Sequence, residues 1–413
     1  MAYESLLRSF YKDASPNRYE NAEALHDLRL NAESTFRSGI VLGEDELFLA
    51  MPTELSLLSD KVLRHERKIA NGMRRLPMVA QRALVRGLVV DEVVSTNDLE
   101  GIYCTRRQID ELLQRDAATD HSNENKRFSG LASLYMDLYG DAPRLPRKPE
   151  DIRQIYDRVM DGEPLDMQHA PDGRLFRKDG VDILAPSGKI VHRGVEPESK
   201  IEELLSEMLR LTRSEEVPEM YGAIMGHFVF EYIHPFYDGN GRTGRYLLAL
   251  GLSHPLSILT SLSLSRVLAE HRGAYYTSFR EAEHPMNHGE LTSFVITVMK
   301  CVGEAQDELD YGLERKRDAC EDLMGHLDGS VSGTTLEGKD ADIIKTLALL
   351  HLFAPFPATP LADIADEIGL GTQQTRARLR RLEAAGLVER CSKRPLRFCL
   401  TDRVADELGV AEP

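Results

Sequence analysis

The chain of 413 residues has no tryptophan, no CxxC pair and no net positive charge. Its five cysteines are scattered along the chain, which is typical of reduced, mostly packed thiols rather than of a disulfide framework or a zinc site. The 67 acidic and 51 basic residues give a formal net charge of −16. This charge excludes a protein that coats nucleic acid over its whole surface, although a local basic face is compatible with it.

Long apolar runs are also scarce. The uncharged stretch from Tyr246 to Ser265 would be long enough to span a bilayer. However, His254-Pro255 interrupts it and six serines or threonines dilute it, so a buried helix with a following segment fits better. The first residues carry charges where a signal peptide needs its apolar core. We therefore expect a soluble, cytoplasmic protein that makes no membrane contact.

What the sequence does contain is mainly a helical pattern. From Glu4 to about residue 120, and again from Lys200 to Met324, apolar residues recur at intervals of three and four. Residues 175–194 differ, because β-branched residues flank Pro186-Ser187-Gly188, which predicts a β-hairpin. The tail reads as helix, helix, turn, helix and hairpin, which is the order of a winged helix-turn-helix. The predicted fold class is therefore mainly α, with one hairpin beside a helical core.

These patterns divide the chain into four predicted parts. They are a helical N-terminal region at residues 1–125, a core at 126–305, a helix and linker at 306–340, and a winged helix at 341–413. The polar stretch 116–127 and the stretch 325–339, which is rich in Gly, Ser and Thr, mark two of the boundaries.

The segment His234 to Arg245, HPFYDGNGRTGR, carries the most chemical information. Its glycines precede a predicted helix, where backbone N–H groups can converge on an anion and the helix dipole adds to the attraction. Arg242 and Arg245 are three residues apart and therefore lie on one face at the positive end of that helix. Two cations at this place suit a polyphosphate better than a single carboxylate.

Two further side chains in the segment extend this interpretation. Asp238 offers a hard oxygen ligand of the kind that Mg²⁺ shared with phosphates requires. His234 is the nearby group that can accept a proton close to neutral pH. The residues thus predict a phosphate-binding loop with a metal carboxylate and a general base. The plainer alternative is a helix–loop–helix turn with a capping aspartate and solvated arginines.

The segment resembles the signature of the Fic family, HPFx(D/E)GNGRxxR, and matches it at all nine fixed positions. The resemblance extends over roughly residues 80–300 and identifies the core at 126–305 as a Fic catalytic core. It implies that ATP is a co-substrate whose AMP is transferred to a Ser, Thr or Tyr hydroxyl of a target protein, with pyrophosphate leaving. Self-modification would be one form of this reaction.

The resemblance also assigns a role to each position. His234 would deprotonate the target hydroxyl, and Asp238 would hold a Mg²⁺ ion between the α- and β-phosphates. The remaining positions would form the anion hole and hold the phosphates: Gly239, Asn240, Gly241, Arg242, Thr243, Gly244 and Arg245.

Two other segments acquire a meaning through the same resemblance. The predicted hairpin would be the family flap, which pairs with an extended target segment by strand addition. Val181, Asp182 and Ile183 would then lie at the target and nucleotide edge, although an ordinary surface hairpin is an equal alternative. Tyr275 and Tyr276 fall where family members place aromatic residues near the adenine, and a role in the core is the alternative for both.

A second motif lies far upstream, in the segment Thr96 to Gly101 (TNDLEG). It resembles the family's inhibitory motif, (S/T)xxxE(G/N), in which the glutamate pairs with the last arginine of the signature. Glu100 would then pair with Arg245 and compete with the γ-phosphate for it. The alternative is a helix N-terminus, because Ser95-x-x-Asp98 and Asn97-x-x-Glu100 both match capping arrangements.

The tail is locally basic. From Gly371 to Phe398, eight basic residues stand against two acidic ones, a local excess of +6. A recognition helix with a basic wing suits DNA phosphates, and docking to a protein is the alternative.

Three hypotheses follow for the whole chain. The leading one is an autoinhibited protein adenylyltransferase. The others are an enzyme that removes AMP at the same site and a DNA-binding regulator whose core only senses nucleotide. An oligomer is compatible with each of them.

Overall fold

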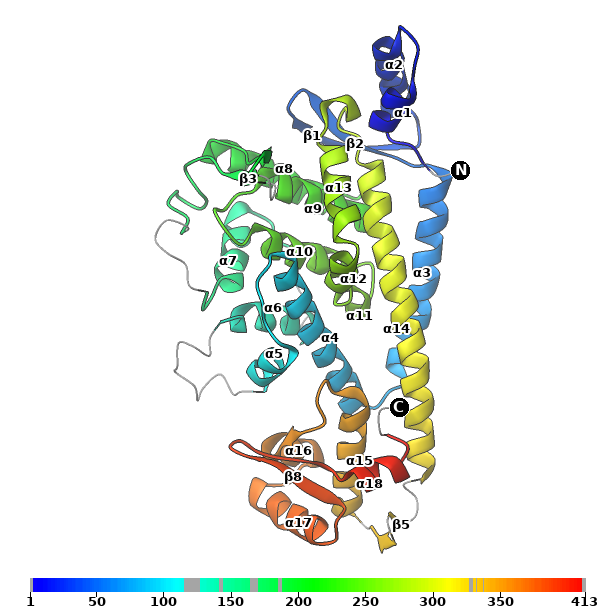
Figure 1. Cartoon of the computed structure of the whole chain (residues 1–413), viewed down its shortest axis with the longest axis vertical. Helices are drawn as coiled ribbons and strands as arrows, with labels where there is room; N and C mark the ends of the chain where they lie inside the picture. The colour runs from blue at the N-terminus through cyan, green and yellow to red at the C-terminus, as the bar shows by residue number, and fades with distance from the viewer. Residues whose placement is uncertain are drawn as a thin grey trace. The chain divides into compact units, whose positions relative to one another are not determined.

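The computed structural model describes residues 3–114, 127–140, 144–163, 170–184, 188–326, 330–331, 333–336 and 338–410. These residues are mainly helical, as predicted (Figure 1). Contacts divide the chain into two compact units. The first comprises Met1–Glu66, Glu92–Tyr103 and Ser122–Asp307, and the second comprises Arg67–Asp91, Cys104–His121 and Glu308–Pro413. The domain boundaries predicted after residues 125, 305 and 340 are not tested by this division and remain predictions.

The first unit begins with two helices and a hairpin. Helices α1 (Leu6–Lys12) and α2 (Arg18–Leu30) precede β1 (Thr35–Leu42) and β2 (Asp45–Ala50), which pair antiparallel. The prediction of a helical pattern was wrong for residues 35–50. The hairpin turns at Gly43, whose φ of 69° suits glycine.

The core of the first unit is built around one buried helix, α9 (Glu219–Ile233). Helices α8 (Glu198–Leu211) and α10 (Asn240–Leu252) both pack against it. The other elements of this unit are α6 (Ser129–Gly140), α7 (Pro149–Val159), β3 (Asp182–Leu184), β4 (Ile190–Arg193), α11 (Ile258–Ser261), α12 (Leu264–Glu270), α13 (Arg272–Ala282) and η2 (Pro285–Asn287).

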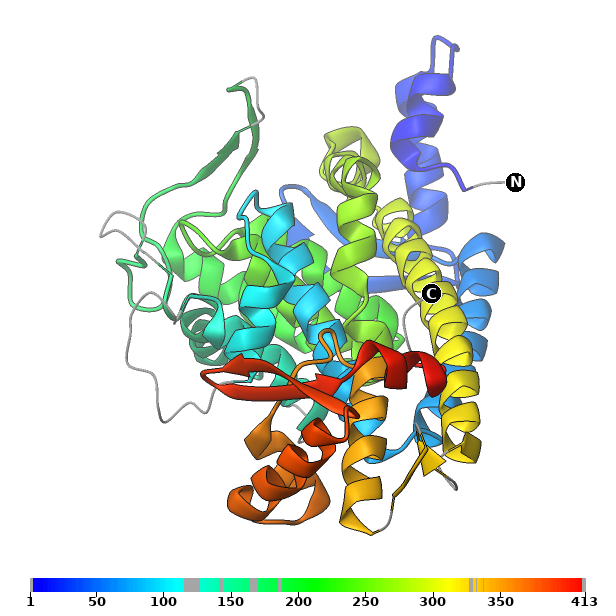
Figure 2. The ribbon, with the colours of Figure 1, turned by 60° about the horizontal axis from the view of Figure 1, so that its bottom comes forward.

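The predicted flap is a hairpin in the structure. Strands β3 and β4 pair antiparallel, with Ile183 opposite His192. Figure 2 shows this hairpin extending from the helices of the first unit. Of the predicted turn, Pro186 and Ser187 lie outside the described residues, as does most of the polar stretch 116–127.

Three long helices contribute residues to both units: α3 (Thr53–Arg74), α4 (Met78–Leu99) and α14 (Thr292–His326). The second unit also holds α5 (Arg106–Leu113), β5 (Ser330–Val331), β6 (Thr334–Thr335), α15 (Lys339–Phe353), β7 (Thr359–Pro360), α16 (Leu361–Ile368), α17 (Thr372–Ala384), β8 (Val388–Lys393), β9 (Leu396–Leu400) and α18 (Asp402–Glu407).

The order of elements predicted for the tail is confirmed. Helices α15, α16 and α17 are followed by the β8–β9 hairpin, which appears in red beside them in Figure 2. A short strand that the sequence did not predict, β7, completes a sheet of order β7-β9-β8.

The cysteines follow the prediction only in part. Cys104, Cys301 and Cys320 are buried thiols outside any disulfide among the described residues, as expected. Cys391 and Cys399 instead form a disulfide, so the prediction of reduced thiols was wrong for this pair. The pairing of β8 with β9, which is irregular between Arg390 and Ser392, brings the two residues together. No sequence motif marks such a contact.

Among the described residues, no helix is long and apolar enough to cross a membrane. The uncharged stretch 246–265 is divided among α10, α11 and α12.

Candidate active site

The turn at His234 has an unusual backbone. Helix α9 ends at Ile233, and His234 follows in the left-handed region with φ 51° and ψ 60°. Pro235 comes next and cannot continue the helix. A non-glycine residue in this region costs on the order of 1 kcal/mol or more, and such residues cluster at functional sites. The turn therefore persists only because its surroundings hold it.

Arg177 is the main group that holds this turn. Its side chain is fully buried, and its Nε donates to the carbonyl oxygen of His234 (2.8 Å). Its Nη2 donates to the carbonyl oxygens of Ile233 (3.2 Å) and Val195 (2.8 Å). One guanidinium thus satisfies two carbonyl groups at the end of α9, those of Ile233 and His234, which have no partner within the helix.

The loop after His234 is closed by its own side chains. Asn240 accepts a hydrogen bond from the Phe236 N–H (2.9 Å) and donates one to the Phe236 carbonyl (2.7 Å). Gly239, with φ 79°, lies at the N-cap of α10. Asp238 Oδ1 accepts from the Gly239 N–H (2.6 Å). The predicted glycine-rich loop therefore does lead into a helix N-terminus.

A cavity of about 650 Å³ lies beside this loop in the first unit. Seven of the residues predicted for the site line it: Glu100, Ile183, His234, Gly241, Arg245, Tyr275 and Tyr276. The others predicted do not line it: Thr96, Gly101, Val181, Asp182, Asp238, Gly239, Asn240, Arg242, Thr243 and Gly244. The structure thus brings the predicted base, the last arginine and the predicted brake into one cavity.

The protonation of His234 follows from its partners. Its Nδ1 lies 3.3 Å from the carbonyl oxygen of Glu231, which can only accept, so Nδ1 carries the hydrogen. Nε2 makes no hydrogen bond within the described part of the chain and keeps its lone pair. Burial lowers the pKa of His234 to about 4. At neutral pH this imidazole is therefore an unprotonated base.

Arg245 is buried, and Glu100 and Thr96 occupy its donors. Its Nη2 donates to Glu100 Oε1 (2.7 Å) and to the Thr96 carbonyl (2.9 Å), and its Nε donates to Thr96 Oγ1 (2.7 Å). Burial alone would raise the pKa of Glu100, but the Arg245 guanidinium outweighs it and leaves this pKa lowered. The pair is therefore charged at neutral pH.

The position of Glu100 excludes a helix N-terminus as the explanation of its motif. Helix α4 begins at Met78 and ends at Leu99, so this motif lies at a helix C-terminus and is not an N-cap. Gly101, with φ 71°, ends the helix. A Cβ atom on Gly241 would lie 2.1 Å from Glu100 Oε1, so the carboxylate reaches α10 only because residue 241 is glycine.

Arg242 has a different environment from Arg245. It is buried, and its Nη1 donates to Glu163 Oε1 (2.9 Å). Its Nη2 lies 3.3 Å from Met160 Sδ. Glu163 also pairs with Arg127. Although predicted as a phosphate ligand, Arg242 is committed to an ion pair outside the cavity lining.

Asp238 meets the requirements of a metal ligand. Half of its side chain is exposed, and Oδ2 lies 3.9 Å from the nearest cation, Arg242 Nη2. Mg²⁺ is usually bound by one or two carboxylates together with substrate phosphates and water. Asp238 could supply such a carboxylate oxygen beside the N-terminus of α10.

The two predicted aromatic residues have different surroundings. Tyr275 is buried, and its hydroxyl lies 2.6 Å from His227 Nε2. Tyr276 is partly exposed and donates to the Leu99 carbonyl (3.4 Å). Because the Gly244 carbonyl accepts from His227 Nδ1 (3.1 Å), Tyr275 is the donor to Nε2. Burial lowers the pKa of His227 to about 3, so this histidine is a neutral part of the core.

Comparisons with known proteins point to one family. A profile described as the Fic/DOC family matches residues 146–252. This chain therefore contains a Fic/DOC family domain over residues 146–252. The match contains α9, the signature loop and α10, which contribute Glu231, His234, Gly241 and Arg245 to the lining of the cavity.

The relatives with curated names match short segments. A probable protein adenylyltransferase of Aquifex aeolicus is 44% identical over 61 residues, which is 15% of this chain and 17% of that protein. Protein adenylyltransferase Fic of Nematostella vectensis is 33% identical over 87 residues, 21% of this chain and 18% of that protein. The match therefore covers less than a fifth of either relative.

A solved structure resembles the chain over a greater length. The crystal structure of a Fic family protein from Desulfovibrio desulfuricans G20 aligns with a TM-score of 0.52 and 17% identity, covering 86% of this chain and 97% of that one. At this identity the likeness concerns the fold alone.

Several residues of the Fic cavity were missed by the sequence analysis. They are Val191, His192, Glu231, Arg272, Phe279, Arg280 and Glu283 in the lining, and Arg177 behind it. Only Glu231 carried a signal, since it lies three residues before His234 on α9. Burial raises the pKa of Glu231 to about 8, and its Oε1 has no hydrogen-bond partner among the described residues. Glu231 is therefore mainly protonated at neutral pH.

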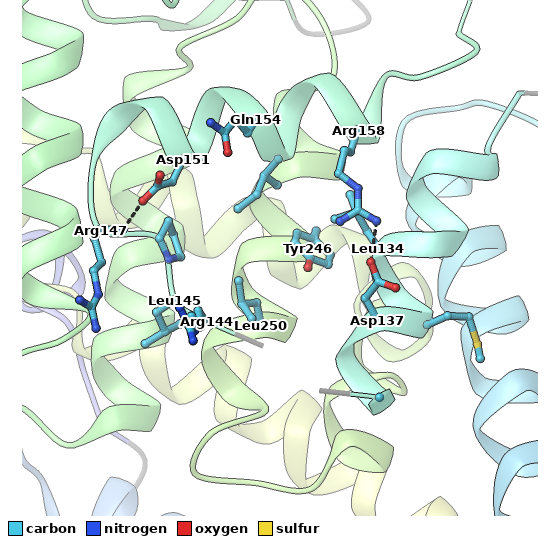
Figure 3. Close-up of a pocket in the computed structure, with 14 residues that line it drawn as sticks. Leu134, Asp137, Arg144, Leu145, Arg147, Asp151, Gln154, Arg158, Tyr246 and Leu250 are labelled. Atoms are coloured by element: carbon cyan, nitrogen blue, oxygen red, sulfur yellow. Dashed lines mark hydrogen bonds and ion pairs between the residues drawn. The ribbon is translucent and has the colours of Figure 1, made fainter. Parts of the chain in front are cut away.

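A second hollow lies between α6, α7 and α10 and is distinct from the Fic cavity (Figure 3). It measures about 1160 Å³, and Tyr246, Leu250 and Arg158 are among its lining residues. Arg158 is paired with Asp137 there (2.6 Å). None of the residues predicted for the site lines this hollow, so the chemistry is assigned to the smaller cavity.

Proposed function

We propose that this protein is an autoinhibited protein adenylyltransferase, which transfers AMP from ATP to a hydroxyl side chain of a protein. The observation that carries the proposal is the meeting of His234, Arg245 and Glu100 in one cavity. These are a base, a phosphate-binding cation and a carboxylate that occupies the cation. The names of the Aquifex and Nematostella relatives agree with this chemistry.

The reaction begins with proton transfer to His234 Nε2. As the proton leaves, the hydroxyl oxygen of the target forms a bond to the α-phosphorus of ATP. The bond from that phosphorus to the oxygen shared with the β-phosphate breaks, and pyrophosphate leaves. The lowered pKa of His234 keeps the base free at neutral pH, and the Arg177 hydrogen bond holds the turn in place.

The phosphates are held by backbone and cations. The N-terminal N–H groups of α10, from Asn240 onward, would face a developing negative charge with the positive end of the helix dipole. Arg245 binds the outer phosphates once Glu100 has left it. Mg²⁺ held by Asp238 would neutralise charge on the phosphates during transfer.

Autoinhibition follows from the occupancy of Arg245. Its terminal Nη2 donates to Glu100 and to the Thr96 carbonyl, so a phosphate must displace the carboxylate in order to bind. The carboxylate also reaches Gly241, at the first turn of α10, where it repels an incoming anion.

The direct test replaces the base. His234→Ala should lower transfer of label from ATP labelled at the α-phosphate by roughly 10²- to 10⁴-fold, while binding of ATP, measured by calorimetry, should persist. His271→Ala is a matched control, because His271 is an exposed histidine outside the cavity lining. Undiminished transfer by His234→Ala would overturn the proposal.

A second candidate function, duplex DNA binding, is favoured by the charges on the tail. The order α15, α16, α17 and β8–β9 is that of a winged helix, in which α17 would be the recognition helix. Arg378 and Arg381 pair with Asp340, and Arg390 pairs with Glu383. In the described part of the chain, by contrast, four exposed basic residues of α17 and the hairpin have no ion pair: Arg376, Arg380, Lys393 and Arg394.

These four cations suit the phosphates of a duplex. The full chain should therefore bind a fluorescent 20-base-pair duplex with an affinity that falls as salt rises. Arg376→Ala with Arg380→Ala should weaken binding and reduce the salt slope by about two. The control, Arg64→Ala with Arg107→Ala, removes the same charge from exposed residues of other helices. Equal binding by both double variants would contradict this function.

A further inference from the structure

The β3–β4 hairpin is tied to the helices through one side chain, that of His192 on β4. Its Nε2 lies 2.7 Å from the carbonyl oxygen of Tyr232 on α9. Its Nδ1 lies 3.1 Å from Glu283 Oε2, just after α13. The imidazole is nine-tenths buried, and its ring meets the Tyr232 ring edge-on with centroids 4.9 Å apart.

Both partners of His192 are hydrogen-bond acceptors. A backbone carbonyl has no proton to donate, and an ionised carboxylate has none either. A neutral imidazole carries one N–H and can therefore satisfy only one of the two. Both contacts form together when the imidazole is protonated on both nitrogens, with Glu283 ionised. His227 makes the opposite case, since Tyr275 donates to its Nε2 and the ring is satisfied while neutral.

The surrounding charges favour the protonated form. Burial alone would lower the pKa of His192, but Glu283 outweighs it and the pKa is raised. Glu231 on α9 adds to the rise only in its ionised form, whereas a positive charge on His234 would oppose it. On the hairpin itself, Arg193 and Asp182 pair with each other.

This tie sets the position of part of the cavity wall. Ile183 pairs with His192 across the two strands, and Val191 precedes it on β4. The side chains of Ile183 and Val191 both line the cavity that contains His234. When His192 is held, these two side chains stand at the wall, and when it is released, they are free to move with the hairpin.

We propose that His192 and Glu283 are positioning residues that hold the β3–β4 hairpin at the cavity through an ionic tie, which requires a charged imidazole. The inference rests on the proposed function in one respect, namely that the hairpin aligns the hydroxyl of the target. The sign follows from the raised pKa of His192. The tie is complete below the ordinary value of about 6.5 and is lost as the pH rises through the raised value.

Glu283→Gln separates this tie from an ordinary contact. A glutamine amide can donate to an unprotonated Nδ1, while Nε2–H still donates to Tyr232. This variant therefore keeps both contacts with a neutral His192, and the tie no longer depends on pH. His192→Ala removes both contacts. His271→Gln is the matched control, because His271 is an exposed histidine paired with Glu304 (2.9 Å).

The first measurement is self-labelling by labelled ATP from pH 6 to 9, with each variant made in a Glu100→Gly background. The parent and His271→Gln should lose about tenfold in rate across the pKa of His192, the value of one charge-assisted hydrogen bond. Glu283→Gln should show no such fall over this interval, and His192→Ala should be low at every pH. The same alkaline fall in Glu283→Gln and in the parent would overturn the proposal.

The second measurement does not need catalysis and so separates this proposal from the proposed function. Imidazole ¹⁵N NMR of the full chain, assigned with His192→Ala, reports how many ring nitrogens carry protons. In the parent, His192 should carry two at pH 6 and titrate above 6.5. In Glu283→Gln it should be neutral and protonated on Nε2. A neutral His192 in the parent at pH 6 would overturn the tie, even if no variant transferred AMP.

Discussion

The two arginines of the signature are three residues apart on α10, and both are buried beside a glutamate, yet their surroundings differ. Arg245 pairs with Glu100, whose side chain is 30% exposed and lines the cavity. Arg242 pairs with Glu163, whose side chain is 5% exposed and lies away from the cavity lining. The first ion pair therefore stands where a nucleotide can compete for it, and the second does not.

The difference shows that one helix face can hold two kinds of ion pair. Glu163 neutralises Arg242 and also Arg127, so removing it leaves buried charge without a partner. Removing Glu100 instead uncovers Arg245 toward a cavity, where a phosphate can replace the carboxylate. We therefore expect the first pair to contribute to stability and the second to control activity.

The largest effect on stability should come from Glu163→Gln. This change leaves the buried Arg242 without its counter-charge and should lower the free energy of unfolding by on the order of 3 kcal/mol. Thermal unfolding checks it, with Glu202→Gln as the control, because Glu202 forms a more exposed pair with Arg174. A melting temperature equal to that of the control would mean that the two signature pairs do not differ in this way.

Arg245→Ala, made in the Glu100→Gly background, should follow in size. It removes a charge-assisted phosphate contact, and ATP should bind about ten- to a hundred-fold more weakly. Calorimetry with ATP and Mg²⁺ measures this, with Arg64→Ala as the control at an exposed pair. If ATP bound with unchanged affinity, Arg245 would not be the phosphate ligand.

Asp238→Ala should lower transfer by about tenfold or more, since it removes the carboxylate assigned to the metal. The rate should recover only weakly with excess Mg²⁺, and EDTA should abolish transfer in the parent. Rates measured against Mg²⁺ concentration check both statements. Transfer that did not depend on divalent ions would return Asp238 to the role of a turn cap, through its bond to Gly239.

The smallest expected effect is the change in transfer rate when the pH is lowered below neutral. Because burial lowers the pKa of His234 to about 4, its base form is present above that value and is lost below it. An ordinary histidine would instead lose the base form near pH 6.5. The transfer rate of the Glu283→Gln variant, in which His192 no longer contributes a pH effect, should change less than about twofold between pH 5.5 and 6.5. A clear loss over this interval would contradict the assigned tautomer and burial.

The sequence predicted those features that depend on the local pattern of residues. The order of helices, turn and hairpin in the tail follows from local pattern, and the loop from His234 to Arg245 follows from fixed residues. The hairpin at residues 35–50 was missed, because its apolar residues were taken for part of a helical pattern. The motif at Glu100 was identified, while its place at the end of α4 needed the structure.

The rest depends on contacts between distant segments. Arg177 lies 57 residues before the His234 carbonyl that it holds, and Glu283 lies 91 residues after His192. Glu163, which binds Arg242 outside the cavity lining, lies 79 residues before it in the sequence. No local spacing marks these partners, because each side chain would look like an ordinary surface charge in its own segment.

The central claim is that Glu100 holds Arg245 away from the nucleotide. Its most direct test is the rate of self-labelling by ATP labelled at the α-phosphate, compared among the parent, Glu100→Gly, and Glu100→Gly with His234→Ala. A partly shielded ion pair can shift this competition by a few kcal/mol, so Glu100→Gly should label about ten- to a thousand-fold faster than the parent. The double variant should fall below Glu100→Gly by roughly 10²-fold or more. If Glu100→Gly labelled no faster than the parent, the autoinhibitory role of Glu100 would be wrong.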